Sequence, residues 1–467
     1  MKAKRPTERG LSSPHPQANG GLENPPSVMR ATELGNLPAE WRVDRFDSLF
    51  DVQQGRQVSK GNRIGENQRP FLRTKNVFWN RLNLADLDEM HFSDADESRL
   101  TLEPDDLLIC ESGDIGRTAI WGGVLSRCYY QNHLHRARIR NPKTTDAQFV
   151  LFWLWYAFEF GHLYFGRGNV TTIPNLSQSK LRELPVAIPS FPEQRKIAGV
   201  VGVVQRAMEQ QERLLALTAE LKKALPHQLF TAGLRGEPQK QTDIGPVPES
   251  WEIVKIGTLG KVVTGSTPKT AIPENYAPPE VDFIAPADLG RTRYIFSSEK
   301  KISRRGFETV RSLPRDAVMC VCIGSSIGKI GMTLKDASAT NQQVNSIICA
   351  EKHDSTFIYY LLSHYAEYWR GFATFGPVPI LSKGAFEAIE IVVPSTKDEE
   401  IELAECFRAL DAKAEVHMRR KVLLTDLFRT LLHQLMTAQI RVHALDLPEL
   451  EILAAGNGGR AAAGLHQ

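Results

Sequence analysis

Two long stretches of the chain have the hydrophobic spacing of amphipathic helices. Residues 192–230 and 398–436 are rich in Glu, Gln, Lys, Arg, Ala and Leu and contain no Gly-Pro break, and these residue types favour helices. Apolar residues recur every three or four positions, as in a heptad seam. We predict two long helices that pack against each other. The seam positions are Ile197, Val200, Val204, Ala207, Leu214, Leu221 and Leu225 in the first stretch, and Leu403, Cys406, Leu410, Leu424, Leu427 and Leu431 in the second.

Polar residues interrupt this predicted seam, and one proline lies inside it. Proline lacks the backbone N–H that a helix needs, so we expect the first helix to kink or to end early at Pro226. At 1.5 Å per residue, each helix is about 50–60 Å long. The polar seam residues are Gln211, Thr218, His417 and Arg420.

Short apolar runs separated by Gly and Pro precede each long helix. The runs "DLLICES" (106–112) and "AVMCVCI" (317–323) are typical of buried strands. With one or two helical segments beside them, they predict a mixed α/β globule in each half.

The chain is an internal repeat. Residues 33–55 align without a gap to 243–265 at an offset of 210, and Trp41 coincides with Trp251. "CESGDIGR" (110–117) aligns with "CIGSSIGK" (322–329), and "HQLFTAGLR" (227–235) aligns with "HQLMTAQIR" (433–441). The near-constant offset indicates two copies of one globule-and-helix unit.

This repeat predicts the fold class and the domain boundaries. We expect an α+β protein with two globules, each followed by a long helix, and an antiparallel coiled coil with pseudo-two-fold symmetry. The boundaries are a disordered tail at 1–32, globule 1 at 33–190, helix 1 at 191–232, a linker at 233–242, globule 2 at 243–395, helix 2 at 396–441 and a tail at 442–467.

Composition restricts the class of protein. The chain has 467 residues, 42% of them hydrophobic and 24% charged, which is ordinary for a globular protein. No apolar run reaches the ~20 residues of a membrane span, and no signal core opens the chain. The six cysteines form no metal-binding spacing; we interpret Cys320 and Cys322 as small core residues. We expect a reduced, cytoplasmic protein.

The stretch "IGSSIGKIG" (323–331) has some features of a phosphate-binding loop. That loop needs four residues between its glycines and a hydroxyl after the lysine, whereas three residues separate Gly324 from Gly328, and Ile330 follows Lys329. We therefore predict a glycine turn between strands, with Arg117 and Lys329 at matching positions. These two cations either contact DNA phosphate or lie in solvent.

The net charge of the chain is only +3, but charge is concentrated in particular segments. Residues 52–83 contain seven Lys or Arg and one acid, with Asn and aromatic residues between them. Such a stretch can attract phosphates and pair with base edges, or it can be an ordinary solvated basic face. The second globule has its cations further along, in "KKISRRGFETVRSLPR" (300–315). The candidate DNA-binding residues are Arg56, Lys60, Arg63, Arg69, Arg73, Lys75, Asn76, Arg117, Lys300, Lys301, Arg304, Arg305 and Lys329.

Catalytic motifs are incomplete. "ENPPS" (23–27) has Ser27 where an adenine methyltransferase has an aromatic residue, and "EPDDLLICESG" (103–113) lacks the Glu-x-Lys element of nucleases. We expect Glu103, Asp105 and Asp106 to flank a strand. His133 and His135 lack further ligands, so they are a weak metal signal. We predict no catalytic site, metal site or cofactor site in this chain.

The sequence resembles the specificity subunit of type I restriction-modification enzymes over about residues 33–441. The resemblance rests on the paired "IGPVPESWE"-type boxes at Trp41 and Trp251, the turns "SGDIGR" and "GSSIGK", "IPSFPEQRKIA" (188–198), and the junction 227–252. The start of the second helix departs from this pattern, because "STKDEEIELA" (395–404) replaces "SFPEQRKIA".

The resemblance implies function, partners and cofactors. The globules would be target-recognition domains that each read half of a gapped sequence in double-stranded DNA. The helices would space them and dock two methyltransferase subunits, which use S-adenosylmethionine. Restriction subunits, which use ATP and Mg²⁺, would join the complex, and this chain would not be catalytic by itself. Two alternatives are a coiled-coil scaffold with protein- or RNA-binding modules, and a nuclease or methyltransferase in its own right.

Overall fold

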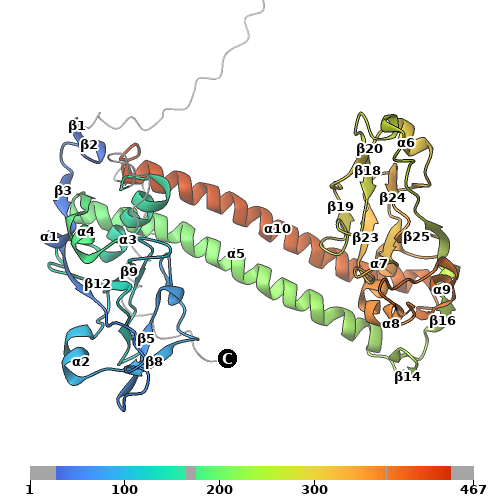
Figure 1. Cartoon of the computed structure of the whole chain (residues 1–467), viewed down its shortest axis with the longest axis horizontal. Coiled ribbons are helices and arrows are strands. Elements are labelled where there is room, and N and C mark those ends of the chain that lie inside the picture. Colours follow the sequence, from blue (N-terminus) through green and yellow to red (C-terminus); the bar gives the residue numbers. More distant parts are fainter. Residues whose placement is uncertain (1–27, 165–174, 375, 443–467) are drawn as a thin grey trace, which may run out of the picture. The chain divides into compact units, whose positions relative to one another are not determined.

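The computed structural model describes residues 28–164, 175–374 and 376–442 of the chain. The chain divides into two compact units: unit 1 comprises residues up to 209 and from 422 onward, and unit 2 comprises residues 210–421. Each unit contains one globule and parts of two long helices, α5 (Phe191–Ala232) and α10 (Lys397–Met436) (Figure 1).

Two sheets form most of the globule of unit 1. The first has the order β10-β9-β12-β4 with antiparallel neighbours, and the second has the order β11-β5-β8. Their strands are β4 (Phe50–Gln54), β5 (Gln68–Leu72), β8 (Asp88–His91), β9 (Leu107–Cys110), β10 (Thr118–Ile120), β11 (Tyr129–Tyr130) and β12 (Leu134–Ile139).

Smaller elements complete unit 1. Three strand pairs are β1 (Met29–Thr32) with β2 (Gly35–Pro38), β3 (Arg42–Arg45) with β13 (Pro185–Ile188), and β6 (Val77–Phe78) with β7 (Arg81–Leu82). The shorter helices are α1 (Phe46–Leu49), η1 (Thr74–Asn76), α2 (Asp94–Leu100), α3 (Ala147–Trp155), the π-helix η2 (Tyr156–Phe160) and α4 (Gln178–Glu183).

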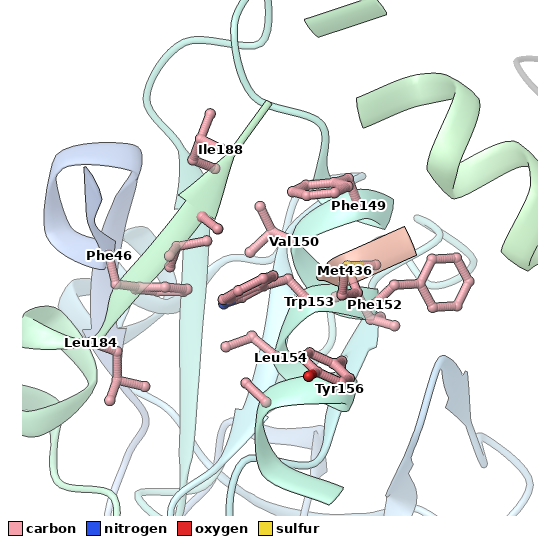
Figure 2. Packing of buried hydrophobic residues seen from close by; sticks show 14 of the residues in the cluster. Phe46, Phe149, Val150, Phe152, Trp153, Leu154, Tyr156, Leu184, Ile188 and Met436 are labelled. Atoms are coloured by element: carbon pink, nitrogen blue, oxygen red, sulfur yellow. The ribbon is translucent and has the colours of Figure 1, made fainter. Parts of the chain in front are cut away.

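Helix α3 is the centre of the unit 1 core. Its sequence "AQFVLFWLW" is apolar almost all round, and seven of its nine residues are buried. Figure 2 shows Trp153 and Leu154 extending toward Phe46 and strand β13, while Met436 of α10 lies beside Phe152. A helix that is apolar on every face must be covered on every face, and here the sheets cover one side and the long helices the other.

Unit 2 repeats this architecture. Its sheets have the orders β17-β25-β22-β23-β19 and β20-β18-β24-β21, and the pairs β14-β15 and β16-β26 stand apart from them. The strands are β14 (Gln239–Thr242), β15 (Gly245–Pro248), β16 (Glu252–Lys255), β17 (Gly260–Thr264), β18 (Val281–Ile284), β19 (Tyr294–Ile295), β20 (Lys301–Ile302), β21 (Ser312–Leu313), β22 (Val318–Val321), β23 (Ile330–Thr333), β24 (Ser338–Thr340), β25 (Val344–Cys349) and β26 (Glu390–Val393).

The strand register confirms that the two globules are copies. His135 pairs with Gln54 in unit 1, and Asn345 pairs with Thr264 in unit 2, so both partners shift by the same 210 residues. The parallel pair β5-β11 also has its counterpart in the parallel pair β18-β24. The helices of this unit are η3 (Ile256–Thr258), η4 (Pro273–Asn275), α6 (Arg304–Glu308), α7 (Ser355–His364), α8 (Ala366–Arg370) and α9 (Lys383–Ala388).

A buried tryptophan fastens each globule to the start of its helix. The Trp41 indole donates a hydrogen bond to Glu193 Oε2 at 3.3 Å, and the Trp251 indole donates to Glu399 Oε1 at 3.0 Å. A buried indole N–H needs an acceptor, which explains an acid at both positions.

The changed sequence at the start of α10 keeps the contacts of α5. Gln194 Oε1 accepts from the backbone N–H of Asp146 at 2.9 Å, and Glu400 Oε2 accepts from that of Asp354 at 2.7 Å. The second oxygen of Glu400 lies 2.7 Å from Nδ1 of His353. The loss of "PEQR" in the second copy therefore exchanges a neutral contact for a carboxylate contact at the same place.

The long helices run antiparallel where they pack together. Within unit 2, Glu212 pairs with Lys421 at 3.0 Å and Lys222 pairs with Asp411 at 2.6 Å, so the α10 partner moves back as α5 advances. The inward-facing positions alternate in steps of four and three, which is a heptad seam. They are Ile197, Val201, Val204, Met208, Gln211, Leu215, Thr218, Lys222, Leu225 and Leu229 in α5, and Leu403, Phe407, Leu410, Ala414, His417, Lys421, Leu424, Phe428, Leu431 and Leu435 in α10.

The predicted seam was partly out of phase with this one. Leu214, Leu221 and Leu427 were expected inside it, but they are 37%, 49% and 45% exposed. Arg420 is also exposed. The error arose because leucines occupy two neighbouring faces of each helix, and spacing alone does not say which face meets the partner.

Two of the polar seam residues form a hydrogen bond with each other. Gln211 Oε1 lies 2.8 Å from Nδ1 of His417 across the helix pair. The Thr218 hydroxyl donates to the carbonyl of Leu214 in its own helix at 2.7 Å. The other ring nitrogen of His417, Nε2, is buried and has no hydrogen-bond partner among the described residues.

Two further expectations need correction. Helix α5 continues through Pro226 to Ala232, so the proline does not end it. The tail predicted at 1–32 lies mostly outside the described residues, but Met29–Thr32 form strand β1, because β2 supplies its hydrogen-bond partners.

The "ENPPS" segment and most of the tail at 442–467 lie outside the described residues. No helix in the described ranges is long and apolar enough to cross a membrane.

Candidate nucleic-acid interface

The loop between β4 and β5 carries the most accessible part of the predicted basic stretch. Arg56 lies near the start of this loop, where it forms an ion pair with Asp96 and a 3.1 Å hydrogen bond with Asn62. Beyond Arg56, Lys60 and Arg63 are exposed and form no ion pair with any described residue. These two predicted DNA contacts are therefore free to meet a phosphate.

Other cations of the same stretch are neutralised within the globule. Arg69 pairs with Glu97 at 2.8 Å, Arg73 with Asp88 at 2.6 Å, and Lys75 with Asp86 at 2.9 Å. Residues 84–98 contain six acids, Asp86, Asp88, Glu89, Asp94, Asp96 and Glu97, which balance the excess of six cations in 52–83.

The contact with Arg73 favours the ionised form of Asp88. The hydrogen bond from Arg73 holds the pKa of the Asp88 carboxyl below its ordinary value, with further help from Lys75 and against a smaller effect of burial. The predicted field of the basic stretch is therefore weaker than its local charge suggests. The charge count over residues 52–83 missed this effect, because the acids that pair with these cations lie after residue 83, mainly in the next strand and helix.

Asn76 is not a surface contact, so this prediction was wrong. Its side chain is 1% exposed. Its Nδ2 donates to the carbonyls of Asn83 and Asp86, and its Oδ1 accepts from the backbone N–H of Arg73. All three contacts hold the hairpin β6-β7 in place, and buried amides of this kind are structural.

The glycine turns connect antiparallel strands, as predicted. Gly116 and Gly328 have φ of 81° and 100°, which side chains rarely adopt. A phosphate-binding loop leads into a helix, whereas these turns lead from β9 to β10 and from β22 to β23.

The two matched cations after the turns differ in exposure. The Arg117 side chain is 16% exposed, ion-pairs with Asp114 and donates to the Thr74 carbonyl. Its guanidinium also lies 5.1 Å from the ring centroid of Phe78. Lys329 is exposed. Arg117 therefore packs against the hairpin β6-β7 and stabilises it, while the exposed Lys329 is available to a ligand.

The cations of unit 2 lie around helix α6. Lys300, Arg304 and Arg305 are exposed and form no ion pair with another described residue. Lys301 is also exposed and lies 3.9 Å from Asp282. These four residues remain candidates for phosphate contacts, in a segment that does not match the basic loop of unit 1.

The remaining catalytic and metal candidates have structural roles. Asp106 is buried and accepts from Arg138 at 2.8 Å at the start of β9, and His135 Nε2 lies 2.8 Å from the Leu176 carbonyl. No cluster of three metal-ligating side chains occurs in the parts of the chain that the structure describes. Burial raises the pKa of the Cys322 thiol to about 12, and Cys320 is buried with it in the core of unit 2. Both are unreactive core residues.

Apolar side chains that do not enter the seam lie exposed on both long helices. Single exposed leucines are common, but a row of them along one helix indicates a contact surface. We call these the exposed helix stripes. Leu214, Leu217 and Leu221 share one face of α5, whereas on α10 Val416, Leu423 and Leu427 share one face and Met418 and Val422 share another.

Sequence reasoning missed two residues that link the globules to the long helices. Asn80 reaches Gln205 of α5 in unit 1, and Arg293 reaches Asp411 of α10 in unit 2. The aligned copies carry polar residues at the helix end, Gln205 and Asp411, but the residue that matches Asn80 is Gly290, so the repeat did not reveal the link.

Comparisons with known proteins agree with the repeated architecture. The chain matches the family described as type I restriction modification DNA specificity domain twice, over residues 38–219 and 248–425. It is 21% identical over 427 residues to the MjaX type I restriction enzyme specificity subunit of Methanocaldococcus jannaschii, covering 88% of this chain and 96% of that one. It is 30% identical over 154 residues to the HindI specificity subunit of Haemophilus influenzae, covering 32% of this chain and 33% of that one.

A solved structure shares the fold. The S subunit of a type I restriction-modification system from M. genitalium superposes with a TM-score of 0.52 at 16% identity, covering 85% of this chain and 96% of that chain. The matched ranges cover most of both globules and the larger part of the helix that follows each. The chain therefore belongs to the type I restriction-modification DNA specificity domain family.

Proposed function

We propose that this chain selects a two-part, gapped sequence in double-stranded DNA for a type I restriction-modification complex. Each globule reads one half-site, and the long helices set the gap between them. The observation that carries this proposal is the repeat itself: two globules with the same strand register carry different polar residues at matched places. Base recognition depends on such side chains, so two copies with different surfaces suit two different half-sites.

Partner subunits supply the chemistry. Two methyltransferase subunits, which bind S-adenosylmethionine, dock on the exposed helix stripes, where apolar side chains gain by being covered. Restriction subunits, which use ATP and Mg²⁺, complete the assembly, and the complex acts on DNA in the cytoplasm. The incomplete catalytic motifs support a chain that recognises DNA without modifying or cutting it.

The second candidate is a coiled-coil scaffold whose globules bind protein or RNA. Membership in the DNA specificity family favours the DNA proposal over this one. Salt-dependent binding to duplex DNA separates the two, because phosphate contacts release counterions and a protein scaffold makes none.

Replacing Lys60 and Arg63 with alanine is expected to weaken DNA binding by the full chain. Each lost phosphate contact lowers the slope of log K against log[salt] by about 0.9, so the slope should fall by up to about 2. A mobility-shift titration at several salt concentrations measures both quantities.

The double variant Lys223→Ala/Lys413→Ala removes the same charge from exposed positions of the long helices and serves as the control. It should leave the slope unchanged. If the two double variants behave alike, the loop between β4 and β5 does not touch DNA.

A further inference from the structure

In each unit, a polar residue of the globule contacts the long helix that follows it at a position well beyond the first turn of that helix. In unit 1, Asn80 Nδ2 donates a hydrogen bond to Gln205 Oε1 of α5 at 2.7 Å. In unit 2, Arg293 Nε lies 3.0 Å from Asp411 Oδ2 of α10. We call these two pairs the tethers.

The tethers attach at the same place on their helices. Gln205 lies fourteen residues beyond Phe191, the first residue of α5, and Asp411 lies fourteen residues beyond Lys397, the first residue of α10. At 1.5 Å per residue, each attachment lies about 21 Å along the helix from its start.

In the globule, the tethers start from neighbouring places beside the same strand. The backbone N–H of Asn80 donates to the carbonyl of Thr118 on β10 at 2.9 Å. The carbonyl of Arg293 accepts from the backbone N–H of Met332 on β23 at 2.6 Å. Strands β10 and β23 are the matched strands after the two glycine turns. The residue that matches Asn80 is Gly290, whose backbone N–H donates to the Ile330 carbonyl at 3.1 Å, so Arg293 lies three residues further along the same segment.

Both ends of each tether are held in place. Asn80 has φ of 54°, which fixes its backbone in the left-handed region, and Gln205 is 6% exposed. Gln205 Nε2 donates to Glu209 at 2.9 Å, which orients its amide so that the oxygen faces Asn80.

The unit 2 tether is braced in the same manner by other residues. Asp411 Oδ1 lies 2.6 Å from Nζ of Lys222 and accepts from the Tyr360 hydroxyl at 2.7 Å. Arg293 also donates to the Thr356 hydroxyl at 3.1 Å.

The tethers differ in chemistry and in the globule residue that they use, but they reach the same position on the helix. One is a neutral amide pair, and the other joins a guanidinium to a carboxylate. Apolar packing near the start of each helix already supplies burial, so stability alone does not require a polar pair at the matched position. A polar contact with fixed geometry selects one arrangement among several that are similarly well packed. The repeated feature is therefore the position of the link.

We infer that Asn80–Gln205 and Arg293–Asp411 are positioning pairs, which fix the angle of each recognition globule on its own helix and thereby the gap that the chain accepts. This inference rests on the proposed function.

Phe428 against Phe152 in unit 1 and Phe407 against Tyr360 in unit 2 also hold each globule by apolar packing. The tether adds a polar contact of fixed geometry about 21 Å along the helix, which restricts small rotations that apolar packing tolerates. Loss of a tether should relax the gap and leave the bases of each half-site unchanged.

The test compares duplexes in which the two half-sites are separated by the native gap or by one base pair more or less. The full chain is used in complex with its methyltransferase subunits, and the native gap is taken from the methylated motif of the wild type. For Gln205→Leu, the preference for the native gap should fall by a factor of about 3 to 10, the range expected for one lost hydrogen bond. Substitution of a half-site base should cost as much as it does in the wild type.

Arg206→Ala serves as the control, because Arg206 is the exposed neighbour of Gln205 in the helix and takes no part in the tether, so this variant should keep the wild-type preference. If Gln205→Leu does not fold, Arg293→Met with Arg293→Lys as its control gives the same comparison in unit 2.

Unchanged gap preference in a folded tether variant would overturn the inference, as would a change in the half-site bases. A wild-type complex that shows no two-part motif would overturn the proposed function instead. The two failures are therefore distinguishable.

Discussion

Inserting one heptad into both long helices, after Leu215 and after Lys421, should lengthen the recognised gap and leave both half-site sequences unchanged. Seven residues extend a helix by about 10 Å and return the seam to nearly the same face, because the inward positions alternate in steps of four and three. The two insertion points are equivalent in the repeat, so both helices keep matching lengths. Methylome sequencing of cells that express the variant with its methyltransferase subunits reports the gap.

An insertion of five residues at the same two points is the matched control. Five residues turn the helix by about 500°, which leaves the seam about 140° away from its partner face, so this insertion should destabilise the helix pair and abolish methylation. Altered half-site bases with an unchanged gap in the heptad variant would refute the role of the helices as spacers.

Arg441→Ala should destabilise unit 1 by about 3–5 kcal/mol, the cost of leaving a buried charge without its partner. Arg441 is 7% exposed, and its Nε lies 2.9 Å from Glu193 Oε1 at the start of α5. Its Nη1 also pairs with Glu40 at 2.5 Å. The Trp41 indole donates to the same Glu193, so removal of the guanidinium leaves this carboxylate buried.

Arg235→Ala is the matched control, because Arg235 occupies the equivalent position of the first copy. Its side chain is 80% exposed and lies 3.6 Å from Glu402, and an exposed pair contributes about 0–1 kcal/mol. Hydrogen exchange of the first turns of α5 and α10 reports the two effects separately. Equal protection losses at both helix starts would contradict this account of Arg441.

The repeat was the most informative feature of the sequence. Aligning Trp41 with Trp251 predicted two equivalent globules, and the shared strand register of His135 and Asn345 confirms them. The helix predicted at 191–232 coincides with α5. These predictions were possible because hydrophobic spacing and repeated motifs are properties of the chain itself.

Predictions that depended on contacts between distant segments were less reliable. Asn76 and Arg73 belong to the same basic stretch and were both predicted to contact DNA. In the structure, Asn76 is buried and Arg73 pairs with Asp88. The prediction that Leu214 lies in the seam was wrong for a similar reason. Leu214 and Leu215 lie on neighbouring faces of α5, and the spacing of leucines does not say which face meets the partner helix. Local charge and spacing do not reveal which acid or which face the folded chain brings close.

The central claim is that two globules read two half-sites across a fixed gap. Methylome sequencing of a strain that expresses this chain with its methyltransferase subunits tests it most directly, together with a variant whose residues 33–190 come from another such protein. We predict methylated adenines in a two-part motif with a single gap length, and a replacement that changes one half-site while the gap and the other half-site stay the same. A continuous motif, or a replacement that changes both half-sites, would contradict the account.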